Sequence, residues 1–324
     1  MKKCKVILLA AAILLVAGAV YAQDYPTRPI RMIIPFAPGG ASDFVGRILQ
    51  PKLSEVLGQP VVADNRAGAD GEIGLEIVAR SAPDGYTILL ANVQIITINP
   101  NINSKSQINP LRDLIGITEV VDVPGGLAIH PSIPATTVAD FIAYAKTRPG
   151  QLNYGSAGLT SPSTLAFEYL MTKAGIKIMP IHYKGGAGAA TIALLSSEVT
   201  VALGTVASFL PHLKSGKLKL IGVMAKKRLA SLPDTPTLAE SGFPELTTGS
   251  WQGVYVPVGT PRPIVDKLYS AFSKVMNDPW VIERLATSGA ESITSKSPED
   301  FAVFMKSQNV FWAQIIKQLG VVRN

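Results

Sequence analysis

Cysteine is almost absent from this 324-residue chain, which has a single cysteine, Cys4. One thiol excludes an internal disulfide framework and the metal sites that are built from cysteine pairs. The three histidines, His130, His182 and His212, are isolated from one another in the sequence. The sequence therefore predicts no metal and no other cofactor.

Concentrated charge is also lacking. Charged residues make up 16% of the chain, and the formal net charge is +7. No run of lysine or arginine is present, and no basic helix carries interleaved aromatic residues. These absences argue against nucleic acid as a partner, because its phosphates are bound by clustered positive charge.

A long membrane-spanning run is missing as well. Three lysines precede an apolar stretch at 6–20, which has roughly 15 residues where a bilayer needs about 20. This pattern is typical of a cleavable secretory signal peptide, and we expect the cut before Gln23. The exported chain would then be soluble, with 302 residues, no cysteine and a net charge of +4.

The remainder of the chain alternates short β-branched runs with Gly-rich turns and helical patterns. Such alternation predicts α/β lobes, each a parallel sheet with helices on both faces. We expect lobe 1 at 23–125 and 226–324, and lobe 2 at 126–225. Strands are predicted at 30–34, 61–63, 86–91, 127–129, 152–154, 178–182, 199–203, 218–224 and 253–256, and helices at 42–57, 138–147, 163–174, 189–195 and 209–214, with the last helix beginning at Ser297-Pro298.

Two Gly-rich loops, at 36–43 and 154–164, combine glycines and hydroxyl side chains with a helix that follows. Glycine lets backbone N–H groups turn toward a ligand, and the start of a helix attracts anions. The loops therefore predict capture of an anion between the two lobes. The alternative is that both are only tight turns in which Ser42 and Ser161 cap helices.

Each interpretation of these segments as an enzyme site lacks a residue that the corresponding motif requires. Neither loop has the Lys-Ser/Thr pair of a phosphate-binding Walker loop. Residues 154–158 resemble a nucleophile elbow around Ser156, but Tyr154 stands at the first glycine position. Its triad would need Glu168 with His182, or Glu198 with His212. Residues 186–191 are near a dinucleotide fingerprint but end in threonine, so we expect binding without catalysis.

Ordered motifs along the whole chain resemble the substrate-binding receptors of tripartite tricarboxylate transporters, also called Bug-type receptors. Three motifs fall in the proposed lobe 1, two in lobe 2 and three in the return and closing segments. They are 35–43 with Arg47, 65–69 and 83–87, then 154–158 and 183–186, then 233–242, 251–253 and 257–261.

The resemblance implies a type II periplasmic-binding fold, with a hinge and an interlobe cleft that closes on its ligand. It implies a periplasmic, monomeric receptor that binds a small carboxylate (a di- or tricarboxylate, an acidic amino acid or an aromatic carboxylate) and delivers it to membrane transporter subunits. A sensory or orphan binding protein of the same fold is the alternative. The ligand-contacting residues that we expect are Phe36, Pro38, Gly39, Gly40, Ser42, Asp43, Ser156, Ala157, Gly158, Ser161, Ser163, Thr164 and Thr205.

Some positions depart from the family's usual residues, and Thr160 and Thr164 lie beside the proposed ligand. Other departures from the family's usual residues are Ser196-Ser197 and the pair Asp70 and Glu72. Asp43 admits two interpretations. Its carboxylate either interacts favourably with the dipole at the helix N-terminus, or faces the ammonium group of an amino-acid ligand.

Overall fold

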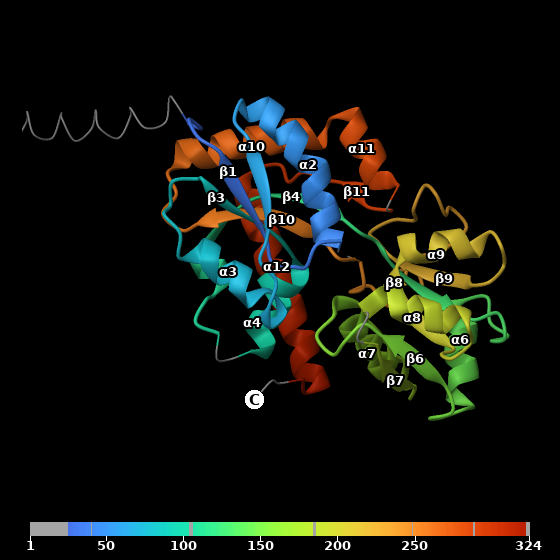
Figure 1. Cartoon of the computed structure of the whole chain (residues 1–324). Coiled ribbons are helices and arrows are strands. Elements are labelled where there is room, and N and C mark those ends of the chain that lie inside the picture. The colour runs from blue at the N-terminus through green and yellow to red at the C-terminus, as the bar shows by residue number, and fades with distance from the viewer. Residues whose placement is uncertain are drawn as a thin grey trace, which may run out of the picture.

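The computed structural model describes residues 25–39, 41–103, 106–183, 186–247, 249–287 and 289–321. The predicted signal peptide lies outside these residues. Within them, no helix is both long and apolar enough to cross a membrane. Figure 1 shows the described chain as two lobes, each with its own sheet and its own covering of helices.

Lobe 1 contains a six-stranded sheet in the order β11-β4-β10-β3-β1-β2. Helices α2 (Ala41–Leu57), α10 (Arg262–Met276) and α11 (Pro279–Ala286) cover one face, while α3 (Glu72–Ala79) and α12 (Pro298–Leu319) cover the other. The strands are β1 (Ile30–Ile34), β2 (Val61–Asn65), β3 (Thr87–Asn92), β4 (Leu114–Asp122), β10 (Gln252–Pro257) and β11 (Glu291–Ser292).

Lobe 2 contains a five-stranded sheet in the order β7-β6-β8-β5-β9. Helices α6 and α7 pack on one face, and α8 and α9 on the other. The strands are β5 (Gly125–Ile129), β6 (Asn153–Ser156), β7 (Met179–His182), β8 (Val201–Thr205) and β9 (Lys219–Met224).

The prediction of purely parallel sheets is wrong at two strands of lobe 1 and at one strand of lobe 2. Strand β10 runs antiparallel to β3 and β4, β11 runs antiparallel to β4, and β5 runs antiparallel to β8 and β9. Strands β10 and β5 each follow directly on a passage from the other lobe, so each enters its sheet from the opposite end. The direction of a strand that enters in this way cannot be read from its own residues.

Local signals set the helix starts. Thr137 and Asp140 form a capping box at the start of α6, and the Ser297 hydroxyl caps α12. The helical segments are α2 (Ala41–Leu57), η1 (Ala69–Gly71), α3 (Glu72–Ala79), η2 (Gln94–Ile98), α4 (Asn99–Ile102), α5 (Pro110–Asp113), α6 (Val138–Lys146), α7 (Pro162–Ala174), α8 (Gly186–Leu195), α9 (Val206–Leu213), α10 (Arg262–Met276), α11 (Pro279–Ala286) and α12 (Pro298–Leu319).

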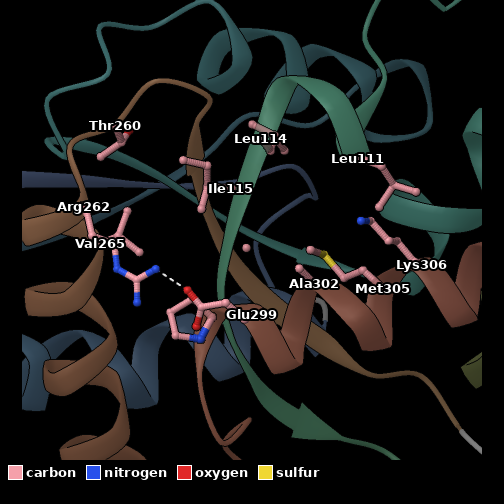
Figure 2. Close-up of a pocket in the computed structure, with 12 residues that line it drawn as sticks. Leu111, Leu114, Ile115, Thr260, Arg262, Val265, Glu299, Ala302, Met305 and Lys306 are labelled. Atoms are coloured by element: carbon pink, nitrogen blue, oxygen red, sulfur yellow. Dashed lines mark hydrogen bonds and ion pairs between the residues drawn. The ribbon is translucent and has the colours of Figure 1, made fainter.

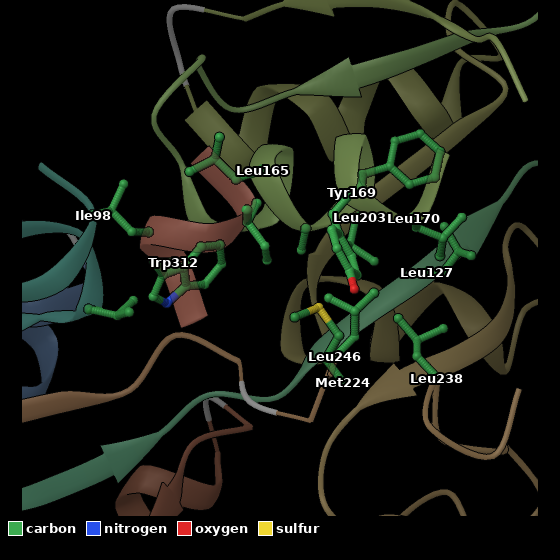
Figure 3. Close-up of a cluster of buried hydrophobic side chains, with 14 of the residues drawn as sticks. Ile98, Leu127, Leu165, Tyr169, Leu170, Leu203, Met224, Leu238, Leu246 and Trp312 are labelled. Carbon is green, nitrogen blue, oxygen red and sulfur yellow. The ribbon is translucent and has the colours of Figure 1, made fainter. Parts of the chain in front are cut away.

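One apolar cluster extends through both lobes. In Figure 3, Ile98 and Trp312 of lobe 1 lie beside Leu165 of lobe 2. Helix α12 supplies Trp312 and packs against α7 as well as against the lobe 1 sheet. The aromatic stripe of α12 is therefore core packing, and it packs the two lobes against each other.

The chain crosses between the sheets twice, after β4 and again before β10. The two crossings touch, because the Ser250 amide donates to the Val123 carbonyl over 3.0 Å. Gly249 lies so close that a Cβ on it would be 1.9 Å from the Val123 oxygen. This contact places a backbone junction at the base of the space between the lobes.

Glu119, near the end of β4, is expected to make the stability of the chain depend on pH. Burial, with the nearby charge of Asp122, raises the pKa of Glu119 to about 8 from an ordinary value of 4.5. The stability that its protonation contributes is complete below the lower value and is lost as pH rises through the higher one. We expect Glu119→Gln to gain melting temperature, relative to wild type, between about pH 5 and about pH 9.

Differential scanning fluorimetry across that range measures the effect. Glu283→Gln, at an exposed site on α11, is the matched control and should show a flat difference. Parallel melting curves for Glu119→Gln and wild type would contradict the assignment.

Candidate ligand-binding site

A cavity of about 160 Å³ lies between the two crossings and the start of α7 with the ends of β8 and β9 in lobe 2. Both crossings contribute to it, through Val123 and Gly125 and through Gly249 and Ser250. Four of the predicted ligand contacts line it: Ala157, Ser161, Ser163 and Thr205. The structure therefore brings part of the predicted second-loop site to the junction of the lobes.

The N-terminus of α7 gives one end of this cavity its polarity. The Ser161 hydroxyl accepts from the Thr164 amide over 3.2 Å, and Ser161 and Ser163 place their hydroxyls 3.3 Å apart. The first turn of α7 has no acidic residue. Because the helix dipole and the unpaired amides of a helix start favour negative charge, this end of the cavity is suited to a carboxylate.

Ser156 lies beneath the loop rather than on the cavity lining. It is 1% exposed, and its hydroxyl contacts Thr164 Oγ1 at 2.9 Å and His182 Nδ1 at 2.9 Å. The Gly158 amide donates to the same oxygen over 3.2 Å. Ser156 thus fixes the shape of the loop that carries Ala157.

The Ser156–His182 contact resembles the nucleophile and base of a catalytic triad. The predicted acid of that triad, Glu168, is bonded to Tyr154 instead. Glu168 accepts a hydrogen bond of 2.5 Å from the Tyr154 hydroxyl. A buried hydroxyl with these partners also gives a substrate no line of approach. The geometry therefore favours a structural use of the pair over nucleophilic chemistry.

Ser156→Ala is expected to weaken ligand binding by roughly two- to tenfold, the loss that corresponds to an ordinary intramolecular hydrogen bond, because Ser156 supports the loop and does not line the cavity. In this structure the loss comes from loosening of the loop at Gly158 and His182. Calorimetry on the variant measures it, and Ser132→Ala, at an exposed serine of the same lobe, is the control. Unchanged affinity, or a covalent adduct of wild type with a serine-directed phosphonate, would contradict this role.

The first Gly-rich loop is held by a polar network of its own. The Asn65 side chain donates to the Phe36 carbonyl over 3.0 Å, and the Gly39 amide donates to Asp43 over 2.9 Å. Arg47 donates to the same Asp43 oxygen over 2.9 Å. Phe36, Pro38, Gly39, Ser42 and Asp43 do not line the cavity, and Gly40 lies outside the described residues.

Asp43 has its positive partner within the chain. The hydrogen bond from Arg47 is the main cause that lowers the pKa of the Asp43 carboxyl below its usual value. Its second oxygen, Oδ1, is buried without a hydrogen-bond partner among the described residues. Arg47, four residues beyond the loop, is thus a residue of the first-loop network that the loop sequence alone did not indicate.

Asp43→Asn is therefore expected to lower the affinities for plain carboxylates and for amino acids by the same small factor. The asparagine oxygen still accepts from Gly39, so the main loss is the charge interaction with half-exposed Arg47, which solvent screens. Calorimetry with succinate and aspartate separates the two interpretations. A loss of about tenfold or more confined to amino acids would instead place the ligand ammonium against Oδ1.

Comparison with known proteins decides the family. The sequence pattern of the tripartite tricarboxylate transporter family receptor matches residues 45–321. The chain belongs to this receptor family. BugT of Bordetella pertussis is 34% identical over 310 residues, which cover 94% of this chain and 93% of BugT.

Solved structures of similar receptors have the same fold. Rpa4515 of R. palustris with adipate has a TM-score of 0.79 at 32% identity, covering 92% of this chain and 99% of that one. MatC of Rhodopseudomonas palustris with bound malate has a TM-score of 0.75 at 28% identity, covering 90% and 100%. The two-lobed periplasmic-binding fold implied by the sequence motifs is confirmed.

The lobes of this receptor-family chain also meet beside the second loop. Gln94 of η2 donates to the Thr160 hydroxyl over 3.3 Å. Asp70 and Glu72 line a small hollow together with Thr160. Several of the positions that depart from the family's usual residues therefore lie together at the contact between the lobes.

A larger cavity, about 420 Å³, lies entirely within lobe 1 between β4, α10 and α12 (Figure 2). Arg262 and Glu299 form an ion pair across its rim, and both side chains are more than half exposed. No predicted ligand contact lines it. It shares no lining residue with the candidate cavity at the junction of the lobes.

Sequence reasoning missed the apolar lining of the candidate cavity, to which Val123, Leu203 and Met224 contribute. Leu203 and Met224 fall within predicted strands, where an apolar residue is ordinary core. No local signal distinguishes them. Among the described residues, no group of three or more histidine, cysteine, aspartate or glutamate side chains could hold a metal ion.

Proposed function

We propose that this chain is a periplasmic solute-binding receptor that captures a small carboxylate and delivers it to membrane subunits of a tripartite tricarboxylate transporter. The observation that carries the proposal is the α7 N-terminus, with Ser161 and Ser163, facing a cavity at the lobe crossings. The carboxylates named with Rpa4515 and MatC, adipate and malate, support the ligand class.

The receptor acts as a monomer and uses no catalytic chemistry. Lobe 1 (23–125 with 226–324) and lobe 2 (126–225) close about the two crossings, and the first loop approaches the ligand when the lobes close. Residues 1–22 serve as a cleaved export signal. A sensory role uses the same trap, and a growth assay on the bound carboxylate, with and without the chain, distinguishes transport from sensing.

A thermal-shift screen of the mature chain against di- and tricarboxylates, acidic amino acids and aromatic carboxylates tests the proposal. A ligand at about 100 times its dissociation constant should stabilise the fold by roughly 2.7 kcal/mol. If no carboxylate in the panel raises the melting temperature, the proposed function fails.

A further inference from the structure

The candidate cavity is lined by both hydroxyl-bearing and apolar side chains. Ser161 and Ser163 line it from the start of α7, while Leu203 of β8, Met224 of β9 and Val123 of the first crossing form its larger apolar lining. Figure 3 shows Leu203 and Met224 lying together where lobe 2 faces the crossings. A ligand with its carboxylate at α7 therefore places the remainder of its body against these apolar side chains.

The size of the cavity limits that body. Its volume is about 160 Å³. A cavity of about 150 Å³ lined by apolar side chains accommodates benzene. The space beyond the carboxylate end thus suits a six-membered ring or a short branched chain.

Charge limits the ligand further. None of the described residues that line the cavity is a lysine, an arginine or a histidine. A second carboxylate directed at Leu203 and Met224 would lose its water and gain no cation, which costs several kcal/mol for an unpaired buried charge. An apolar group at the same place gains free energy from leaving water.

We propose that the ligand is a small monocarboxylate with an apolar, ring-sized body, seated with the carboxylate at α7 and the body against Leu203, Met224 and Val123. This inference rests on the proposed function and narrows its ligand class. It separates this chain from a receptor that selects dicarboxylates such as malate or adipate.

Calorimetry on the wild-type chain tests the proposal without any variant. The probes are benzoate, cyclohexanecarboxylate, succinate, malate and adipate, with benzamide as a neutral match for benzoate. We expect the two ring monocarboxylates to bind at least about tenfold more tightly than each dicarboxylate, and benzamide to bind at least about tenfold more weakly than benzoate.

Met224→Gln then tests the seat itself, because it keeps the length of the side chain and places an amide against the ring. We expect benzoate affinity to fall by about tenfold while succinate affinity does not fall. Met179→Gln makes the same change at a methionine of lobe 2 that is 49% exposed, and it should leave both affinities unchanged. A melting curve checks that each variant is folded.

The possible outcomes distinguish a failure of the monocarboxylate inference from a failure of the proposed receptor function. Dicarboxylates that bind as tightly as benzoate overturn the monocarboxylate inference and leave the receptor function standing. Benzamide that binds as tightly as benzoate overturns the carboxylate seat at α7. Failure of every carboxylate to bind overturns the proposed function together with the inference.

Discussion

Gly249→Ala is expected to lower ligand affinity by at least about tenfold and the free energy of unfolding by about 3 kcal/mol or more, at the upper end of the usual cost of overpacking. The added Cβ would lie 1.9 Å from the Val123 carbonyl oxygen and 2.9 Å from the Gly125 amide nitrogen. Both neighbours are backbone atoms, so the strain cannot be relieved by a rotamer change. The two crossings must separate, and the cavity that they share must widen.

Calorimetry and denaturant unfolding measure the two effects. Gly188→Ala, in α8, is the matched control, because a Cβ there would meet no atom within 4 Å. Wild-type affinity and stability in Gly249→Ala would show that the crossings are not packed as described.

Trp312→Ala is expected to destabilise the chain by about 3–5 kcal/mol, the usual cost of truncating a buried tryptophan. The Trp312 side chain is fully buried in the cluster shared by both lobes, so its loss leaves a cavity between α12 and α7. The melting temperature should fall by roughly 6 °C or more.

Two further variants sharpen this test. Trp280→Ala, at a tryptophan that is 39% exposed, should cost far less. Trp312→Phe should recover much of the loss, because the Trp312 indole N–H has no hydrogen-bond partner among the described residues. Equal destabilisation by Trp280→Ala and Trp312→Ala would contradict the shared cluster.

Elements whose signals are local could be predicted from the sequence. Strand β1 has the predicted bounds, Ile30–Ile34, and α12 begins after Ser297 as expected. A β-branched run and a capping serine act within a few residues of themselves, so both are legible without the remainder of the chain.

Strand β4 had not been predicted, and its residues show why. Gly116 interrupts the apolar pattern because a Cβ there would lie 2.7 Å from Phe301, a residue of the distant helix α12. Glu119 interrupts it again with a partly buried carboxylate. Gly74 lies inside α3, pressed against Pro35 in the same way. Such close approaches depend on partners far along the chain.

The candidate site also combines features that local sequence predicts with features that depend on distant packing partners. The hydroxyls and glycines of the second loop marked a polar ligand seat, and Ser161 and Ser163 do line the cavity. Ser156 has the same local features, yet it is buried, because His182 and Thr164 close over it. The exposure of a loop side chain depends on which residues pack over it, and the loop's own sequence does not determine that packing.

Because the chain is synthesised from its N-terminus, the position of β10 affects the order in which the two lobes can fold. Strand β10 lies at the middle of the lobe 1 sheet, between β3 and β4, yet it follows all of lobe 2 in the sequence. The five strands of lobe 2 lie in one continuous stretch, 125–224, and can pair as soon as they emerge. Lobe 1 must wait for residues 252–257, and contacts of such long sequence separation form slowly. The lobe that is begun first is completed last.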